Sequence, residues 1–121
     1  MGGERQSRDS ILLVEDEPDI REAMAELLEL EGYQTVASAN GKEALEQLHR
    51  MEPPCLILLD VMMPVMDGYA FMDHLKDERP LADIPVVVTS ASHRPPAGAQ
   101  AYVTKPFELE NLLAVIKRFC R

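Results

Sequence analysis

The stretch CLILLDVMMPVMDG, from Cys55 to Gly68, decides the fold. It opens with an apolar run of strand length that ends on a carboxylate, Asp60, and a methionine-rich loop containing Pro64 follows. A strand that is apolar on both faces is typical of the centre of a parallel sheet covered by helices. The stretch therefore predicts a buried strand that holds Asp60 at its carboxyl end.

Strands and helices alternate along the rest of the chain. The composition and spacing of apolar residues predict strands at 10–14, 33–39, 55–60, 84–90 and 101–104, and helices at 18–31, 40–52, 67–78 and 108–120. This alternation implies a parallel sheet with helices on both faces. Because crossovers between parallel strands are right-handed, a doubly wound α/β sandwich is the simplest topology.

The first and last helices are each expected to turn one apolar stripe towards the core. Pro18 suits the first turn of the first helix, and Gly32 ends it. Its stripe consists of Ile20, Met24, Leu27 and Leu28. The stripe of the last helix consists of Leu109, Leu112, Leu113, Ile116 and Phe119 with Cys120.

The bulk properties predict one domain. The 121 residues are 46% hydrophobic and 27% charged, which is ordinary for a globular protein. We expect a flexible polar lead-in at residues 1–9 and a single domain at 10–121.

A net charge of −9 argues against a nucleic-acid surface and fits protein partners or a bound cation. No apolar run is long enough to span a membrane, and the first ten residues lack a signal-peptide core, so a cytoplasmic location is expected.

The two cysteines, Cys55 and Cys120, lie far apart in the sequence and form no CxxC motif. In a chain without an export signal, a reducing cytoplasm is expected to keep both thiols unpaired. The sequence therefore predicts that both cysteines pack as small hydrophobic side chains.

Acidic residues follow two of the predicted strands. Glu15 and Asp16 come directly after the first, and Asp60 ends the third. In open parallel sheets, functional groups gather beyond the carboxyl ends of the strands. If these two strands are neighbours, three carboxylates converge and repel one another unless one is protonated or a cation lies among them. Mg²⁺ prefers oxygen ligands of this kind and often shares them with a phosphate.

Two later strands bring further polar groups to the same edge. Thr89 and Ser90 end the fourth strand, and Lys105 follows the fifth. A metal ion and a lysine together would suit phosphoryl transfer, in which catalysis depends on positioning and on positive charge. Since an aspartate can act as a covalent nucleophile, the pattern predicts that Asp60 accepts the phosphoryl group.

Four segments give the chain a clear family resemblance. ILLVEDEPDIRE, LILLDVMMPVMDG, IPVVVTSA and AYVTKPF resemble, in order and spacing, the motifs of the receiver domain of two-component response regulators. The resemblance covers roughly residues 10–120. It implies a flavodoxin-like five-stranded parallel sheet in the order 2-1-3-4-5, and a signalling domain that catalyses only its own phosphoryl transfer and dephosphorylation.

The resemblance also implies roles for individual residues. Asp60 would accept a phosphoryl group from a histidine kinase or phosphotransfer protein. Asp16 would bind Mg²⁺ directly, and Glu15 mainly through water. The backbone carbonyl of Met62 would be a further ligand, and Lys105, expected to form a cis bond with Pro106, would contact the phosphoryl group.

Two more residues are implied as parts of a conformational switch, namely Ser90 as its hydroxyl and Tyr102 as its aromatic side chain. Thr89 stays open as an alternative to Ser90, because only one of two successive side chains on a strand can face the site. The downstream partner is unknown, and a homodimer is a further expected assembly.

One feature departs from the family pattern. Only ten residues, ASHRPPAGAQ at 91–100, separate the fourth strand from the fifth, and two of them are Pro95 and Pro96. A parallel crossover usually takes a dozen or more residues with a helix, and proline disrupts helix interiors. The fourth helix of the family is therefore expected to be shortened or missing.

Three other functions compete with phosphoryl acceptance. A pseudo-receiver would use the same fold as a docking module without phosphorylation. A phosphohydrolase with an aspartyl nucleophile would need an acid two residues after Asp60, where this chain has Met62. An FMN carrier would need a phosphate-binding loop after the first strand, where the acidic EDEP segment would repel phosphate.

Overall fold

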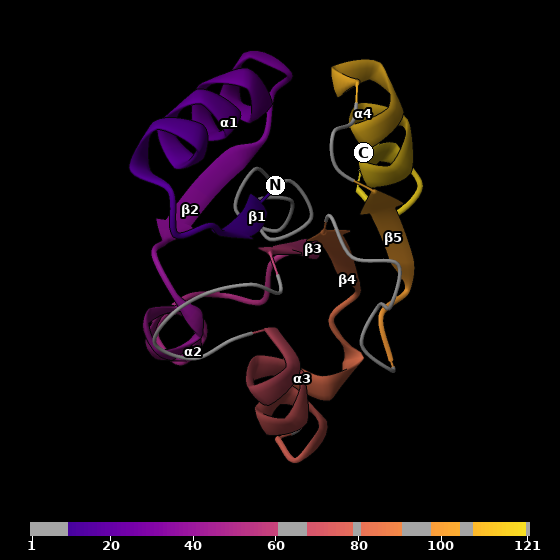
Figure 1. Ribbon diagram of the computed structural model, residues 1–121. Coiled ribbons are helices and arrows are strands. Elements are labelled where there is room, and N and C mark those ends of the chain that lie inside the picture. The colour runs from indigo at the N-terminus through magenta and orange to yellow at the C-terminus, as the bar shows by residue number, and fades with distance from the viewer. Residues whose placement is uncertain (1–9, 61–67, 79–80, 91–97, 105–107, 121) are drawn as a thin grey trace, which may run out of the picture.

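The computed structural model describes residues 10–60, 68–78, 81–90, 98–104 and 108–120. Its centre is a parallel sheet of five strands in the order β2-β1-β3-β4-β5, as expected (Figure 1). The strands are β1 (Ser10–Val14), β2 (Gln34–Ser38), β3 (Leu56–Asp60), β4 (Val86–Ser90) and β5 (Ala101–Thr104). The expected lead-in at residues 1–9 lies outside the described part of the chain.

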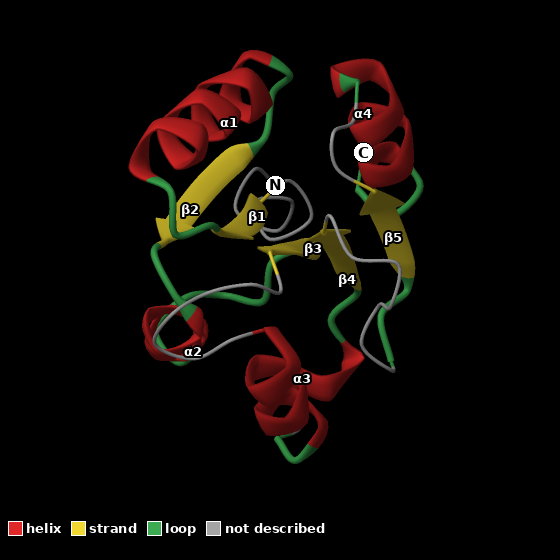
Figure 2. Cartoon of the chain, in the orientation of Figure 1, coloured by secondary structure: helices red, strands yellow, loops and turns green. Residues whose placement is uncertain are grey.

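Helices cover both faces of the sheet (Figure 2). The α-helices are α1 (Pro18–Leu30), α2 (Gly41–Leu48), α3 (Gly68–Lys76) and α4 (Leu109–Lys117), and a short 3₁₀ helix, η3, spans Leu81–Asp83. In the views of Figures 1 and 2, α1 and α4 lie on one side of the sheet and α2 and α3 on the other. None of the helices in the described ranges is long and apolar enough to cross a membrane.

The central strand β3 is buried along its whole length, as its sequence predicts. Ile57 and Leu59 join the core on the side of α2 and α3, while Leu56 and Leu58 join the core on the side of α1 and α4. Because successive side chains point to opposite faces, one five-residue strand contributes to both cores. This burial fixes the position of Asp60 at the end of the strand.

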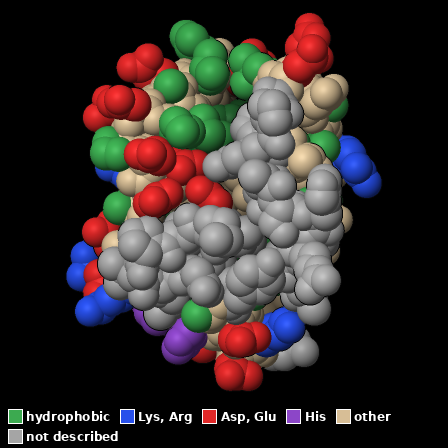
Figure 3. All heavy atoms as spheres, in the orientation of Figure 1, with side chains coloured by type: hydrophobic (Ala, Val, Ile, Leu, Met, Phe, Trp, Pro, Cys, Tyr) green, Lys and Arg blue, Asp and Glu red, His purple; other side chains and the backbone are tan. Residues whose placement is uncertain are grey.

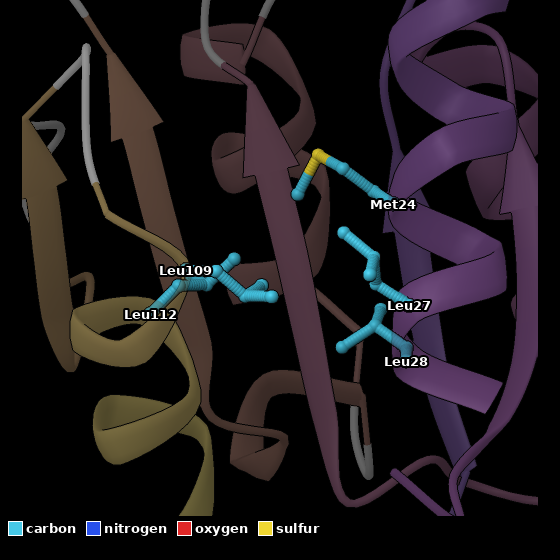
Figure 4. Close-up of a pocket in the computed structure, with 5 residues that line it drawn as sticks. All are labelled: Met24, Leu27, Leu28, Leu109 and Leu112. Atoms are coloured by element: carbon cyan, nitrogen blue, oxygen red, sulfur yellow. The ribbon is translucent and has the colours of Figure 1, made fainter. Parts of the chain in front are cut away.

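The apolar stripes of α1 and α4 are only partly buried, which corrects the sequence-based expectation. Leu28 and Leu112 are about 1% exposed, but Ile20 is 44% exposed and Leu27 and Leu109 are each 37% exposed. For Leu27 and Leu109 the reason is that the two helices do not close over the sheet. Between them lies a pocket of about 220 Å³, which Figure 4 shows lined by side chains from both helices: Met24, Leu27, Leu28, Leu109 and Leu112.

The connection between β4 and β5 contains ten residues, in agreement with the expected loss of a full helix. Its described part, residues 98–100, forms no helix, and Gly98 has a positive φ of 95° that suits a turn. Residues 91–97, including both prolines, lie outside the described ranges. Four α-helices are present in the described residues, with none between β4 and β5.

The expectation of two unpaired thiols is wrong. Cys55 and Cys120 form a disulfide, with their Cα atoms 5.6 Å apart. They are 65 residues apart in sequence, but Cys55 directly precedes β3 and Cys120 follows α4. The last helix packs against the sheet and ends at the edge where β3 begins, and this arrangement brings the two sulfur atoms together.

Candidate phosphoryl-acceptor site

The acidic residues lie at the carboxyl edge of the sheet. β1 and β3 are adjacent and parallel, with Val14 opposite Leu59. Glu15 and Asp16 directly follow β1, and Asp60 is the last residue of β3. The two neighbouring strands therefore end side by side, each delivering carboxylates to the same place.

The three carboxylates form a compact cluster. One oxygen from each of Glu15, Asp16 and Asp60 lies within 4.8 Å of the other two. Glu15 is 2% exposed and Asp60 is 6% exposed, whereas Asp16 is half-buried. Two of these acids are thus buried, and the third is partly exposed to solvent.

The segment after β1 is held by hydrogen bonds on both sides. The Glu15 amide donates to the Ser38 carbonyl oxygen at 3.0 Å, which extends the pairing of β1 with β2. Arg21 in the first turns of α1 donates from Nη1 to the carbonyl oxygens of Glu15 at 2.9 Å and Asp16 at 3.4 Å. The sequence gives no signal for this role of Arg21, because a contact with backbone carbonyls leaves no motif.

The donor set fits a hard divalent cation. Carboxylate oxygens are the ligands that Mg²⁺ prefers, and one or two of them commonly suffice because the ion keeps several waters. Three such groups within 4.8 Å of one another can supply these contacts and would otherwise repel one another. The acidic cluster is therefore consistent with a magnesium site.

The neighbouring strand β4 brings two hydroxyl-bearing residues to this edge. Thr89 lies opposite Asp60 in the ladder between β3 and β4, and its side chain is 3% exposed. Ser90 is the last residue of β4 and lies opposite Thr104 of β5. The strand register alone leaves both residues as candidates for the switch hydroxyl.

Tyr102, the expected switch aromatic, lies in β5 opposite Val88. It is half-buried and packs against the core on the side of α2 and α3. Two other residues expected in the site, Met62 and Lys105, lie outside the described parts of the chain.

Comparison with known proteins identifies the family. Residues 11–117 match the response regulator receiver domain. The phosphate regulon transcriptional regulatory protein PhoB of Escherichia coli is 43% identical over 119 residues, which are 92% of this chain and 51% of PhoB. The chain thus spans about half the length of this curated relative.

Solved structures give the same result. The signal receiver domain of a signal transduction histidine kinase from Syntrophus aciditrophicus is 38% identical, with a TM-score of 0.84 over 92% of this chain and 89% of that one. The response regulator protein TrrA from Thermotoga maritima, solved in complex with Mg²⁺-BeF, is 30% identical, with a TM-score of 0.82 over 92% and 98% of the two chains. Sequence motifs, strand order and these likenesses agree: the chain belongs to the response regulator receiver domains of two-component systems.

Proposed function

We propose that this receiver domain, at residues 10–121, accepts a phosphoryl group on Asp60 and changes conformation in response. The observation that carries the proposal is the cluster of Glu15, Asp16 and Asp60, whose carboxylate oxygens lie within 4.8 Å of one another at the carboxyl edge of the sheet. Asp60 is the acceptor because it ends the fully buried strand β3, which holds its backbone in one position.

In the proposed reaction a carboxylate oxygen of Asp60 attacks the phosphorus of the donor. The new O–P bond forms as the P–N bond of a phosphohistidine breaks, or as the P–O bond of acetyl phosphate breaks, and the leaving group keeps the electron pair. The attack needs an ionised carboxylate held in line with the leaving group. The rigid strand end supplies this orientation.

Glu15 and Asp16 would hold Mg²⁺ beside Asp60, together with the carbonyl of Met62. When bound, the ion would offset negative charge on the phosphoryl oxygens. Lys105 would contact the same oxygens. Ser90 and Tyr102 would carry the change from the site to the surface near β5.

The proposed phosphoryl donors are a histidine kinase or a phosphotransfer protein, and the proposed output is contact with a downstream protein. The curated relative PhoB is about twice as long as this chain. The activity of a longer protein is therefore not transferred to the domain described here.

The test is intact-mass measurement after treatment with acetyl phosphate and Mg²⁺. The wild-type domain should gain the mass of one phosphoryl group, and Asp60→Asn should gain none because it lacks the nucleophilic carboxylate. Asp73→Asn is a matched control, since Asp73 is an exposed acid on α3, away from the cluster.

Beryllofluoride with Mg²⁺, followed by NMR, provides a second measurement that does not depend on the donor. Shifts at Asp60 and along β4 are expected. If neither acetyl phosphate nor beryllofluoride changes the domain, the acceptor role is wrong and the fold serves as a docking module instead.

A further inference from the structure

The disulfide joins two elements that the sheet topology places at the edge opposite the acids. Cys55 stands directly before β3, and Asp60 ends that strand five residues later. At about 3.3 Å per residue, the two residues lie roughly 17 Å apart along the strand. The sulfur pair is thus separate from the carboxylate cluster.

The bond holds the end of the last helix. Leu112, Ile116 and Cys120 follow one another at intervals of four residues and are all buried, so the cysteine completes the inward stripe of α4. The Cys120 amide donates to the Ile116 carbonyl oxygen at 2.8 Å, which continues the helical turn up to the disulfide. α4 itself has only nine residues, too few for a stable helix without tertiary support.

The surroundings of Cys55 suit a reduced sulfur as well as a bonded one. Its Sγ lies 3.1 Å from the carbonyl oxygen of Ser10, which also accepts the Cys55 amide at 2.8 Å. A disulfide sulfur has no proton to donate, whereas a thiol at the same place could donate to this oxygen. Both states of the sulfur therefore have a partner in the folded domain.

The two cysteines differ in their exposure to solvent. Cys55 is partly exposed, while Cys120 is 5% exposed. These 121 residues contain no further cysteine that could exchange with the pair. A small thiol from solution would therefore attack at Cys55.

From these observations we propose that Cys55 and Cys120 form a reversible redox-modification site that fixes α4 to the sheet. In reduction, a thiolate of a small dithiol attacks the Cys55 sulfur, the S–S bond breaks, and Cys120 leaves with the electron pair and takes a proton. The second thiol of the reductant then releases Cys55 as a thiol. In the reverse direction, a disulfide of the glutathione class accepts two electrons and two protons from the protein thiols.

The consequence lies in the groove between α1 and α4. Leu109 and Leu112 of α4 form one wall of the pocket whose other wall is Met24, Leu27 and Leu28 of α1 (Figure 4). Hydrophobic side chains also gather on the outer surface over α1 and towards α4 (Figure 3). The intact disulfide restrains α4 and with it the width of this groove. Reduction of the disulfide lets α4 move relative to α1.

Hydrogen exchange measured on the oxidised protein and after reduction with dithiothreitol tests the proposal. Amides of α4 should exchange faster by about tenfold or more in the reduced form, as expected when a local opening becomes easier. Amides of α2 and α3, on the other face, provide the internal reference. Equal exchange of α4 in both forms, or an equal increase in every helix, would overturn the proposal.

Two single variants test the chemistry at each sulfur. With Cys120→Ser, glutathione disulfide should form a mixed disulfide with Cys55 readily. With Cys55→Ser, the same reagent should react much more slowly with buried Cys120. The proposal also fails if both thiols of the unreduced wild-type protein label with a thiol reagent, because the bond is then absent. The acid cluster takes no part in these readouts, so they are independent of phosphorylation.

Discussion

Asp60 lies directly opposite Thr89 in the ladder between β3 and β4. Ser90 therefore stands one residue farther towards the carboxyl edge than Asp60 does. A phosphoryl group on the Asp60 side chain would extend beyond this edge, and so would lie closer to the level of Ser90 than to that of Thr89. This level favours Ser90, but residues paired in a parallel ladder point their side chains to the same face, which favours Thr89. The register alone therefore leaves both residues open, and the preference for Ser90 rests on the family resemblance.

Replacing the two hydroxyls separately should distinguish them. Ser90→Ala is expected to slow phosphorylation by acetyl phosphate by about tenfold or more, because a donor to the transferring group is lost. Thr89→Val keeps the shape of a side chain that is 3% exposed and should leave the rate nearly unchanged. Rates of mass gain under matched Mg²⁺ concentrations provide the comparison. The opposite ranking would assign the switch to Thr89.

Removal of Asp16, the half-buried acid of the cluster, should affect Mg²⁺ binding most clearly. Asp16→Ala should weaken Mg²⁺ binding by about tenfold or more, since one of three clustered carboxylates is lost. Without the metal the variant should melt at a higher temperature than the wild type, because like-charge repulsion is relieved.

Thermal melts across a Mg²⁺ titration measure both effects of Asp16→Ala, namely the weaker Mg²⁺ binding and the higher melting temperature without the metal. Asp19→Ala is the matched control, because it removes the same charge from the exposed first turn of α1, outside the cluster. The metal assignment is refuted if Asp16→Ala and the wild type respond equally to Mg²⁺.

The amino end of α2 provides a prediction about stability. Asn40 Oδ1 accepts from the Glu43 amide at 2.9 Å, and Glu43 Oε1 accepts from the Ala39 amide at 3.1 Å. Asn40→Ala removes the cap and should lower the free energy of unfolding by about 1 kcal/mol. Glu46→Ala, at an exposed position of the same helix, should change it much less. Urea unfolding of the three proteins measures the difference, and equal midpoints for all three would contradict the capping role.

The strands were predictable because their signals are local, whereas their order was predicted from the family resemblance. β3 is apolar on both faces, Asn40-Gly41 marks the start of α2, and short connections restrict the topology. The meeting of Glu15, Asp16 and Asp60 followed once β1 and β3 were taken as neighbours, and the structure brings these three together. Their chemical roles stay predictions.

Other features depend on how distant elements approach one another. Leu27 and Leu109 have the spacing of buried residues, yet they stay partly exposed because α1 and α4 leave a groove between them. The disulfide needs the end of α4 to meet the start of β3, which no spacing between Cys55 and Cys120 could indicate. Compartment rules based on export signals pointed to unpaired thiols and were wrong here.

The wall of that groove allows a direct comparison of two leucines on α4. Leu112 is 1% exposed and packs in the core beneath α1 and α4, whereas Leu109, one turn earlier, is 37% exposed. Leu112→Ala should lower the free energy of unfolding by about 2–5 kcal/mol, since it removes buried methyl groups and leaves a cavity. Leu109→Ala should cost well under half as much, because water already reaches the side chain and can fill the space. Urea unfolding of both variants in the oxidised state, so that the disulfide is constant, measures the two values. Equal losses would mean that Leu109 is buried in solution and that the groove between α1 and α4 is closed.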